Sequence, residues 1–192
     1  QVSISTNANP VSGGTISGGG TYQVSLPVTL VALPNEGYQF ISWTENGTVV
    51  STSSTYSFTA TASRCLTANF EIQQFTINTA SVPESGGTTS GGGIFTYYEL
   101  VTVIAAVNTG WEFAGWYENG TLISISENYS FPAMLNRNLE ANFTVSAFSI
   151  SLSASPDDGG SVTGGGVFTA GCQVTAEANA AANWAFINWT EA

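Results

Sequence analysis

The feature that most constrains this chain is a motif that returns every 73 residues. The segment GYQFISWTENG at positions 37–47 comes back as GWEFAGWYENG and then as NWAFINWTE. Its last tryptophan is therefore found at Trp43, Trp116 and Trp189. Spacing without insertions predicts a tandem array. The units are residues 1–73 (repeat 1), residues 74–146 (repeat 2) and an incomplete unit of residues 147–192 (repeat 3).

The strand pattern within each repeat predicts an all-β fold. Residues 2–5, VSIS, alternate apolar and small polar side chains, as a half-buried strand does. Residues 28–33, VTLVAL, are apolar on both faces, which is typical of a central strand. The glycine-rich segment between them predicts a tight hairpin. The Asn46-Gly47 pair predicts a type I′ hairpin.

The joints between repeats are expected to be short. Only four residues separate Phe70 from Phe75, and Phe143 from Phe148, and none of these segments resembles a Pro/Gly/Ser linker. We therefore expect a semi-rigid rod of repeats rather than beads on a flexible string.

Charge and composition exclude several classes of function. Thirteen carboxylates face two cations, Arg64 and Arg137, and the net charge is −11. Nucleic acids and anionic membranes need clustered basic residues, so neither is an expected partner. The chain has no His, which excludes Ser-His-Asp and Cys-His catalysis and His-ligated zinc. No apolar run is long enough to span a membrane, and the composition favours an extracellular protein.

The two cysteines, Cys65 and Cys172, fall at unrelated positions of the period. A disulfide repeated in every unit is therefore excluded. We expect two free thiols, both mostly buried.

Aromatic side chains give the strongest candidate binding residues. Each motif contains an earlier and a later aromatic ring, such as Tyr38 and Trp43 in repeat 1. Strand alternation places the earlier and the later rings on opposite faces of the strand. Exposed rings of this kind could stack on sugars, whereas buried rings would form the core of a small unit. We favour the core. The candidate glycan-binding or packing aromatics are Tyr38, Trp111, Trp184, Trp43, Trp116 and Trp189.

One carboxylate recurs in every repeat, as Glu45, Glu118 and Glu191. It could serve as a general acid or a metal ligand, but no second carboxylate recurs with it, as acid/base hydrolysis requires. We favour a solvated flank of the hairpin. Asp157-Asp158-Gly159 could touch Ca²⁺ but is expected to be a turn. The sequence therefore predicts no catalytic residue, no metal site and no cofactor.

The ordered motifs GGTISGGG, VTLVALP, GYQFISWTENG, YSF and LTANF together resemble the bacterial internalin B-repeat-like family, in its divergent form. That resemblance covers essentially the whole chain. It implies small β-grasp-like modules, found in tandem in secreted and cell-surface proteins as spacers or adhesive stalks, without catalytic residues.

We therefore expect a non-catalytic structural element of a bacterial surface protein, stalk or extracellular fibre. Its expected partners are neighbouring repeats or identical subunits. The alternative is a carbohydrate-binding or adhesion module that uses exposed aromatics, with glycans as partners. Repeat 3 has no counterparts of Tyr56, Phe58, Leu66 and Phe70. We expect that this half-unit does not stand alone, and that either a longer native chain or a neighbouring molecule covers its open strand edge.

Overall fold

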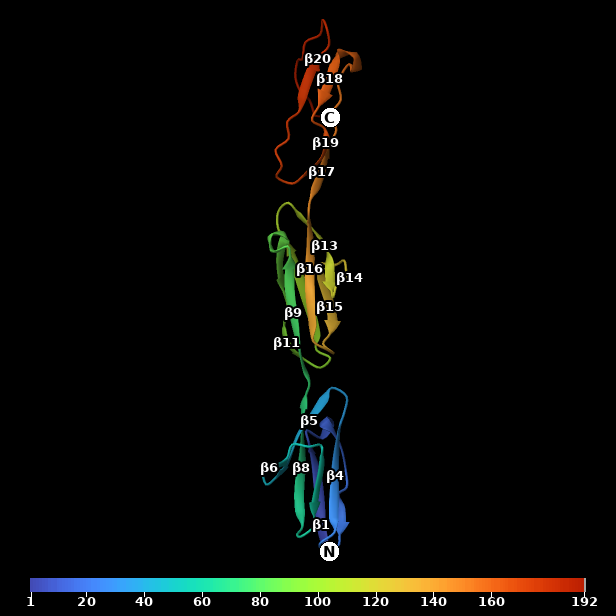
Figure 1. Ribbon diagram of the computed structural model, residues 1–192, viewed down its shortest axis with the longest axis vertical. Helices are drawn as coiled ribbons and strands as arrows, with labels where there is room; N and C mark the ends of the chain where they lie inside the picture. The colour runs from blue at the N-terminus through green and yellow to red at the C-terminus, as the bar shows by residue number, and fades with distance from the viewer. Residues whose placement is uncertain (192) are drawn as a thin grey trace. The chain divides into compact units, whose positions relative to one another are not determined.

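The computed structural model describes residues 1–191 (Figure 1). Its regular elements in that range are β-strands and three one-turn 3-10 helices, so the predicted all-β tandem fold is confirmed. The chain divides into two compact units. The first comprises residues 1–77, 93–101 and 131–137; the second comprises residues 78–92, 102–130 and 138–192.

The elements follow one order in each repeat. Repeat 1 contains β1 (Val2–Asn9), η1 (Val11–Gly13), β2 (Gly14–Ser17), β3 (Gly20–Tyr22), β4 (Pro27–Pro34), β5 (Tyr38–Glu45), β6 (Thr48–Ser51), β7 (Thr55–Thr59) and β8 (Arg64–Ile72). Repeat 2 contains β9 (Gln74–Val82), η2 (Glu84–Gly86), β10 (Gly87–Ser90), β11 (Gly93–Thr96), β12 (Leu100–Val107), β13 (Trp111–Glu118), β14 (Thr121–Ser124), β15 (Asn128–Pro132) and β16 (Arg137–Val145). Repeat 3 contains β17 (Ala147–Ile150), η3 (Asp157–Gly159), β18 (Gly160–Thr163), β19 (Gly166–Thr169) and β20 (Glu177–Ala180).

Repeat 1 consists of two sheets. One sheet has the strand order β3-β1-β8-β5-β6, and the other has the order β2-β4-β7. The first and last strands of the repeat, β1 and β8, pair in parallel, and their other partners are antiparallel. Parallel neighbours need a long crossover connection, which here includes the whole three-stranded sheet. A parallel central pair with antiparallel neighbours agrees with the expected β-grasp-like module.

The core of repeat 1 lies between these sheets. β4 contributes the alternate residues Val28, Leu30 and Ala32, and β8 contributes Leu66, Ala68 and Phe70. The prediction that 28–33 forms a central strand is confirmed, because β4 lies between β2 and β7. Its second apolar face is nevertheless exposed, at Val31 and Leu33.

A β-bulge changes which side chains of β5 face the core. The register against β8 shifts between Phe40 and Ser42, so Ile41 is an extra residue. An extra residue reverses the alternation that follows it. Trp43 therefore points into the same core as Phe40, with ring centroids 5.9 Å apart, and Ile41 is exposed. The prediction that Trp43 shares a face with Ile41, opposite Phe40, was wrong.

The glycine-rich segment is not a hairpin. β2 pairs with β4 in one sheet, whereas β3 pairs with β1 in the other, so the glycines carry the chain between sheets. Gly13 instead makes room for a ring, because a Cβ there would lie 2.5 Å from the Cβ of Phe70. The Asn46-Gly47 hairpin is confirmed: φ is 50° at Asn46 and 80° at Gly47, as a type I′ turn requires.

Both cysteines are free, as predicted, but both are exposed, so the prediction of buried thiols was wrong. On β8 the core residues are Leu66, Ala68 and Phe70. Cys65 is out of phase with them and therefore faces outward. Cys172 follows β19, and its sulfur lies 2.9 Å from the hydroxyl of Thr169.

Repeat 2 uses the same strand orders, β11-β9-β16-β13-β14 and β10-β12-β15. Trp116 is fully buried, and a register shift between Phe113 and Gly115 repeats the bulge. Among the described residues of repeat 3, 147–191, two strand pairs form, β17 with β19 and β18 with β20. Residues 184–189, which match the start of β5, form no strand.

Candidate functional site

The six candidate aromatics lie in three kinds of environment. Trp43 and Trp116 are fully buried, and each indole N–H donates to a backbone carbonyl, at Ser54 and Glu127 respectively. Tyr38 and Trp111 are half-buried. Trp184 and Trp189 are 48% and 44% exposed. Buried rings cannot stack on a sugar, so within this set the rings of repeat 3 are the most available to a partner.

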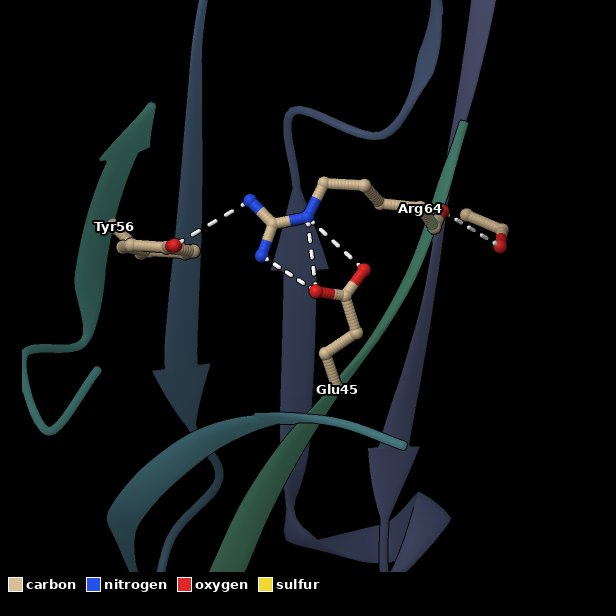
Figure 2. A network of polar contacts seen from close by, with 4 residues as sticks. Glu45, Tyr56 and Arg64 are labelled. Carbon is tan, nitrogen blue, oxygen red and sulfur yellow. Dashed lines mark hydrogen bonds and ion pairs between the residues drawn. The ribbon is translucent and has the colours of Figure 1, made fainter. Parts of the chain in front are cut away.

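A polar cluster joins β5 to the start of β8 (Figure 2). Arg64 donates from Nε and Nη2 to the Glu45 carboxylate, with the shortest distance 2.8 Å. Its Nη1 donates to the hydroxyl of Tyr56 at 3.4 Å. The guanidinium also lies 4.4 Å from the ring centroid of Phe58. Arg64 therefore ties the five-stranded sheet to β7 of the other sheet.

The ion pair shifts the two pKa values in opposite directions, and both shifts favour the charged form. The hydrogen bond from Arg64 lowers the pKa of Glu45, against a smaller opposing effect of burial. The hydrogen bond to Glu45 raises the pKa of Arg64. Glu45 is therefore a carboxylate at neutral pH, with no proton to donate as a general acid. Glu45 was predicted to be a solvated hairpin flank; it is a partly buried partner of Arg64 instead.

The sequence contains a signal that could have predicted this cluster. The only two cations, Arg64 and Arg137, occupy the same repeat position, as Glu45 and Glu118 do. In repeat 2 the guanidinium of Arg137 lies 4.3 Å from the ring centroid of Phe131, the counterpart of Phe58. A cation that recurs with a carboxylate predicts a pair, even when 19 residues separate them.

The remaining candidates show no metal-binding geometry. Asp157-Asp158-Gly159 forms the one-turn helix η3, consistent with the predicted turn. Across residues 1–191, no group of three or more His, Cys, Asp or Glu side chains is placed to hold a metal ion. No helix in that range has the length and apolar character of a membrane span.

A joint in the first compact unit is built around Gln73, the single residue between β8 and β9. Its N–H donates to the carbonyl of Gly37, and its carbonyl accepts from the N–H of Tyr97, both at 2.8 Å. The Tyr97 hydroxyl donates to Glu36 at 2.6 Å, and the Tyr97 ring lies against Gly37. The second unit has an equivalent joint at Ser146, where Ala170 replaces Tyr97.

Repeat 3 has a cleft of about 350 Å³ between its strands and the last segment of the chain. Its lining includes Val162, Ala178, Trp184, Phe186 and Trp189. The matching side chains of repeat 1 are Ile16, Ala32, Tyr38, Phe40 and Trp43, which belong to the core cluster or pack against it. The side chains that form or border the core in repeat 1 therefore line an open cleft in repeat 3.

The strand order, the bulge and the packing of an arginine on a phenylalanine ring thus describe one module that occurs in both repeat 1 and repeat 2. A family model described as the divergent InlB B-repeat domain matches residues 4–74, 77–147 and 150–192. The chain belongs to this family. Three tandem divergent InlB B-repeats account for nearly all of the chain, which is therefore a repeat module of the kind found in surface proteins. Comparisons with curated proteins and with solved structures give no match.

Proposed function

We propose that these divergent InlB B-repeats form a non-catalytic, load-bearing stalk of a bacterial surface protein or extracellular fibre. The observation that carries this proposal is the parallel pairing of β1 and β8 in repeat 1. Six residue pairs join them, from Ile4 with Arg64 to Asn9 with Asn69. The chain enters the repeat at the start of β1 and leaves it at the end of β8, beside Gln73.

This geometry decides how tension acts on the repeat. The start of β1 and the end of β8 lie at opposite ends of the parallel pair, so pulling on them slides the strands past each other. The backbone hydrogen bonds are then loaded together rather than one after another. Forced unfolding is governed by the unfolding rate rather than by the free energy of unfolding. This arrangement therefore resists tension more strongly than the equilibrium stability of the repeat alone would predict.

Single-molecule pulling of the full chain in two directions tests the proposal. The sliding geometry uses handles at Gln1 and at a Gln73→Cys site, with Cys65→Ser and Cys172→Ser removing the native thiols. The peeling geometry uses handles at Gln1 and the native Cys65, which is exposed and pairs with Ser5. Only Cys172→Ser is needed there.

We expect repeat 1 to unfold at a severalfold higher force in the sliding geometry. The peeling geometry is the matched control, because the fold is the same and only the direction of load differs. Equal forces in the two directions would contradict a load-bearing role.

The alternative, adhesion to glycans through exposed aromatics, is supported only by the exposure of Trp184 and Trp189. A polysaccharide-binding assay with Trp184→Ala and Trp189→Ala distinguishes it, because these changes should abolish sugar binding and leave the pulling forces of repeat 1 unaltered. A net charge of −11 also argues against nucleic acid or anionic membrane as a partner of either function.

A further inference from the structure

We propose that the joint at Gln73 carries a binding site for a neutral oligosaccharide. A groove of about 500 Å³ lies at this joint, within the range of roughly 300–1,000 Å³ that is usual for small-ligand sites. The proposal adds a ligand to the structural role above and does not depend on it. All of the lining residues belong to the first compact unit: Gln39, Glu71, Ile72, Gln73, Gln74 and Phe75.

Three of the six glutamines of the chain line this groove. Phe70 of β8 is in the core, so Glu71, the next residue, faces outward, and Gln39 of β5 lies directly opposite it. Gln74 is exposed and Gln73 is half-buried. Within residues 1–191, no protein group bonds to the three side-chain amides or to the Glu71 carboxylate. Their hydrogen-bonding capacity is therefore available to a ligand.

The joint in the second compact unit shows that these side chains are not needed to connect repeats. There Ser146 replaces Gln73. The N–H of Ser146 donates to the carbonyl of Gly110, and its carbonyl accepts from the N–H of Ala170, as in the first joint. A joint therefore forms without any of the three amides. The counterparts of the four polar groove residues are Glu112, Thr144, Ser146 and Ala147.

The groups that line the groove suit the chemistry of a sugar. A side-chain amide offers a donor and an acceptor in one plane, and a carboxylate accepts several hydrogen bonds, so both match neighbouring hydroxyls. Ile72 is 40% exposed and Phe75 is half-buried, and together they provide an apolar surface for the C–H face of a pyranose ring. A neutral sugar therefore finds partners for both its polar and its apolar surface.

Charge and strand pairing disfavour other ligands. Among the lining residues Glu71 alone is charged, so an acidic sugar or a phosphate would meet a like charge. The strands that line the groove, β5, β8 and β9, each have a neighbour on both sides, so a peptide finds no strand edge to extend. The groove shares no residue with the exposed aromatics of repeat 3, Trp184 and Trp189.

NMR of the isotope-labelled 192-residue protein tests the proposal through the side-chain amide signals of its glutamines. The probes are the neutral hexasaccharides cellohexaose, laminarihexaose and mannohexaose, and the acidic oligomer hexagalacturonate. We expect at least one neutral probe at millimolar concentration to give saturable shifts of Gln39, Gln73 and Gln74. The signals of Gln23 and Gln173 should remain unchanged, and hexagalacturonate should give no shifts.

The matched control gives the first joint the polar residues of the second. Its changes are Gln39→Glu, Glu71→Thr, Gln73→Ser and Gln74→Ala, which leave the net charge as it is. This fourfold variant should fold, because the second joint forms with these residues, and should bind the active probe at least about tenfold more weakly. Gln74→Ala alone changes one exposed side chain and should weaken binding about threefold or more, which keeps the test decisive if the fourfold change disturbs the joint.

Four results would overturn the proposal. The first is that no neutral probe shifts the three amides, and the second is that hexagalacturonate shifts them equally. The third is that the fourfold variant and Gln74→Ala both bind as tightly as the wild type. The fourth is that Trp184→Ala or Trp189→Ala abolishes the shifts, because the sugar would then bind repeat 3. Loss of binding in the joint variants, with both tryptophan variants unaffected, is the expected result.

Discussion

Repeat 1 and repeat 3 share a motif but bury different parts of it. In repeat 1 the indole of Trp43 is sealed between two sheets; in repeat 3 the matching Trp189 is 44% exposed, and Ile187, the match of Ile41, is 90% exposed. The difference follows from the strands that surround the motif, since β7 and β8 have no counterparts among the strands that the structure describes within residues 147–191. Burial in these repeats is therefore a property of strand pairing, which the amphipathic sequence permits but does not by itself produce.

The largest expected effect contrasts the two tryptophans. Trp43→Ala should destabilise repeat 1 by roughly 3–5 kcal/mol, because it removes a fully buried ring and leaves a cavity. Trp189→Ala should change the stability of repeat 3 by less than about 1 kcal/mol. Hydrogen exchange read separately for each repeat measures both effects. Similar losses at the two positions would show that repeat 3 has a packed core of its own.

The next contrast compares Gly13 with its counterpart in repeat 3, Gly159. Gly13→Ala should cost repeat 1 about 1–3 kcal/mol, because its Cβ would collide with Phe70 at 2.5 Å. Gly159→Ala should stay within about 0.5 kcal/mol, because the nearest atom is 3.5 Å away. Denaturant unfolding followed by repeat-specific amide signals compares the two variants. Equal tolerance at both positions would mean that the ring contact in repeat 1 is easily displaced.

A smaller effect comes from the ion pair. Glu45→Gln should cost repeat 1 up to about 1 kcal/mol at neutral pH, a modest amount because the pair is partly exposed. Glu45 has a folded pKa below its ordinary value of 4.5, so its contribution is present above that pH and is lost as pH falls through the folded pKa.

Acid titration of the unfolding midpoint should therefore bring the wild type and Glu45→Gln together as the pH falls below the folded pKa of Glu45. Glu191→Gln is the matched control in repeat 3, where we expect no change in stability at any of these pH values. A Glu45→Gln deficit that persists in acid would indicate a cause other than the charge.

The smallest effect concerns the joint at Gln73. The hydrogen bond to Glu36 raises the pKa of Tyr97 to about 12. This contact therefore stabilises the folded state below about pH 10, the ordinary tyrosine pKa, and is lost as pH rises to about 12. Ultraviolet titration, with Tyr97→Phe to assign the signal, should show a late-ionising tyrosine that Glu36→Gln returns towards its ordinary pKa. Unchanged titration in Glu36→Gln would rule out the contact in solution.

The sequence predicted some features well because they depend on local chemistry. The 73-residue period, the Asn46-Gly47 hairpin and the central position of β4 all follow from short patterns. The outward direction of Cys65 could also have been predicted, since Leu66, Ala68 and Phe70 alternate beside it. The prediction of buried thiols rested on the general tendency of cysteine to be buried and did not take this alternation into account.

Other features depend on register between distant strands. The bulge at Ile41 is defined only against β8, and nothing in the motif itself marks the extra residue. The pairing of Arg64 with Glu45 likewise requires the antiparallel alignment of β5 and β8. The glycine segment was predicted as a hairpin because its composition suits a turn, but which sheet each flanking strand joins is decided by long-range pairing.

The placement of the two arginines has a consequence for proteolysis. Trypsin cuts only after Lys or Arg, and this chain offers it Arg64 and Arg137 alone. Each residue is the first of a long strand, β8 or β16, that has a neighbour on both sides in its five-stranded sheet. A protease must draw an extended segment into its active site, so cleavage requires that strand to open first. Trypsin would thus leave the folded repeats intact, and each cut would report the opening of one central strand.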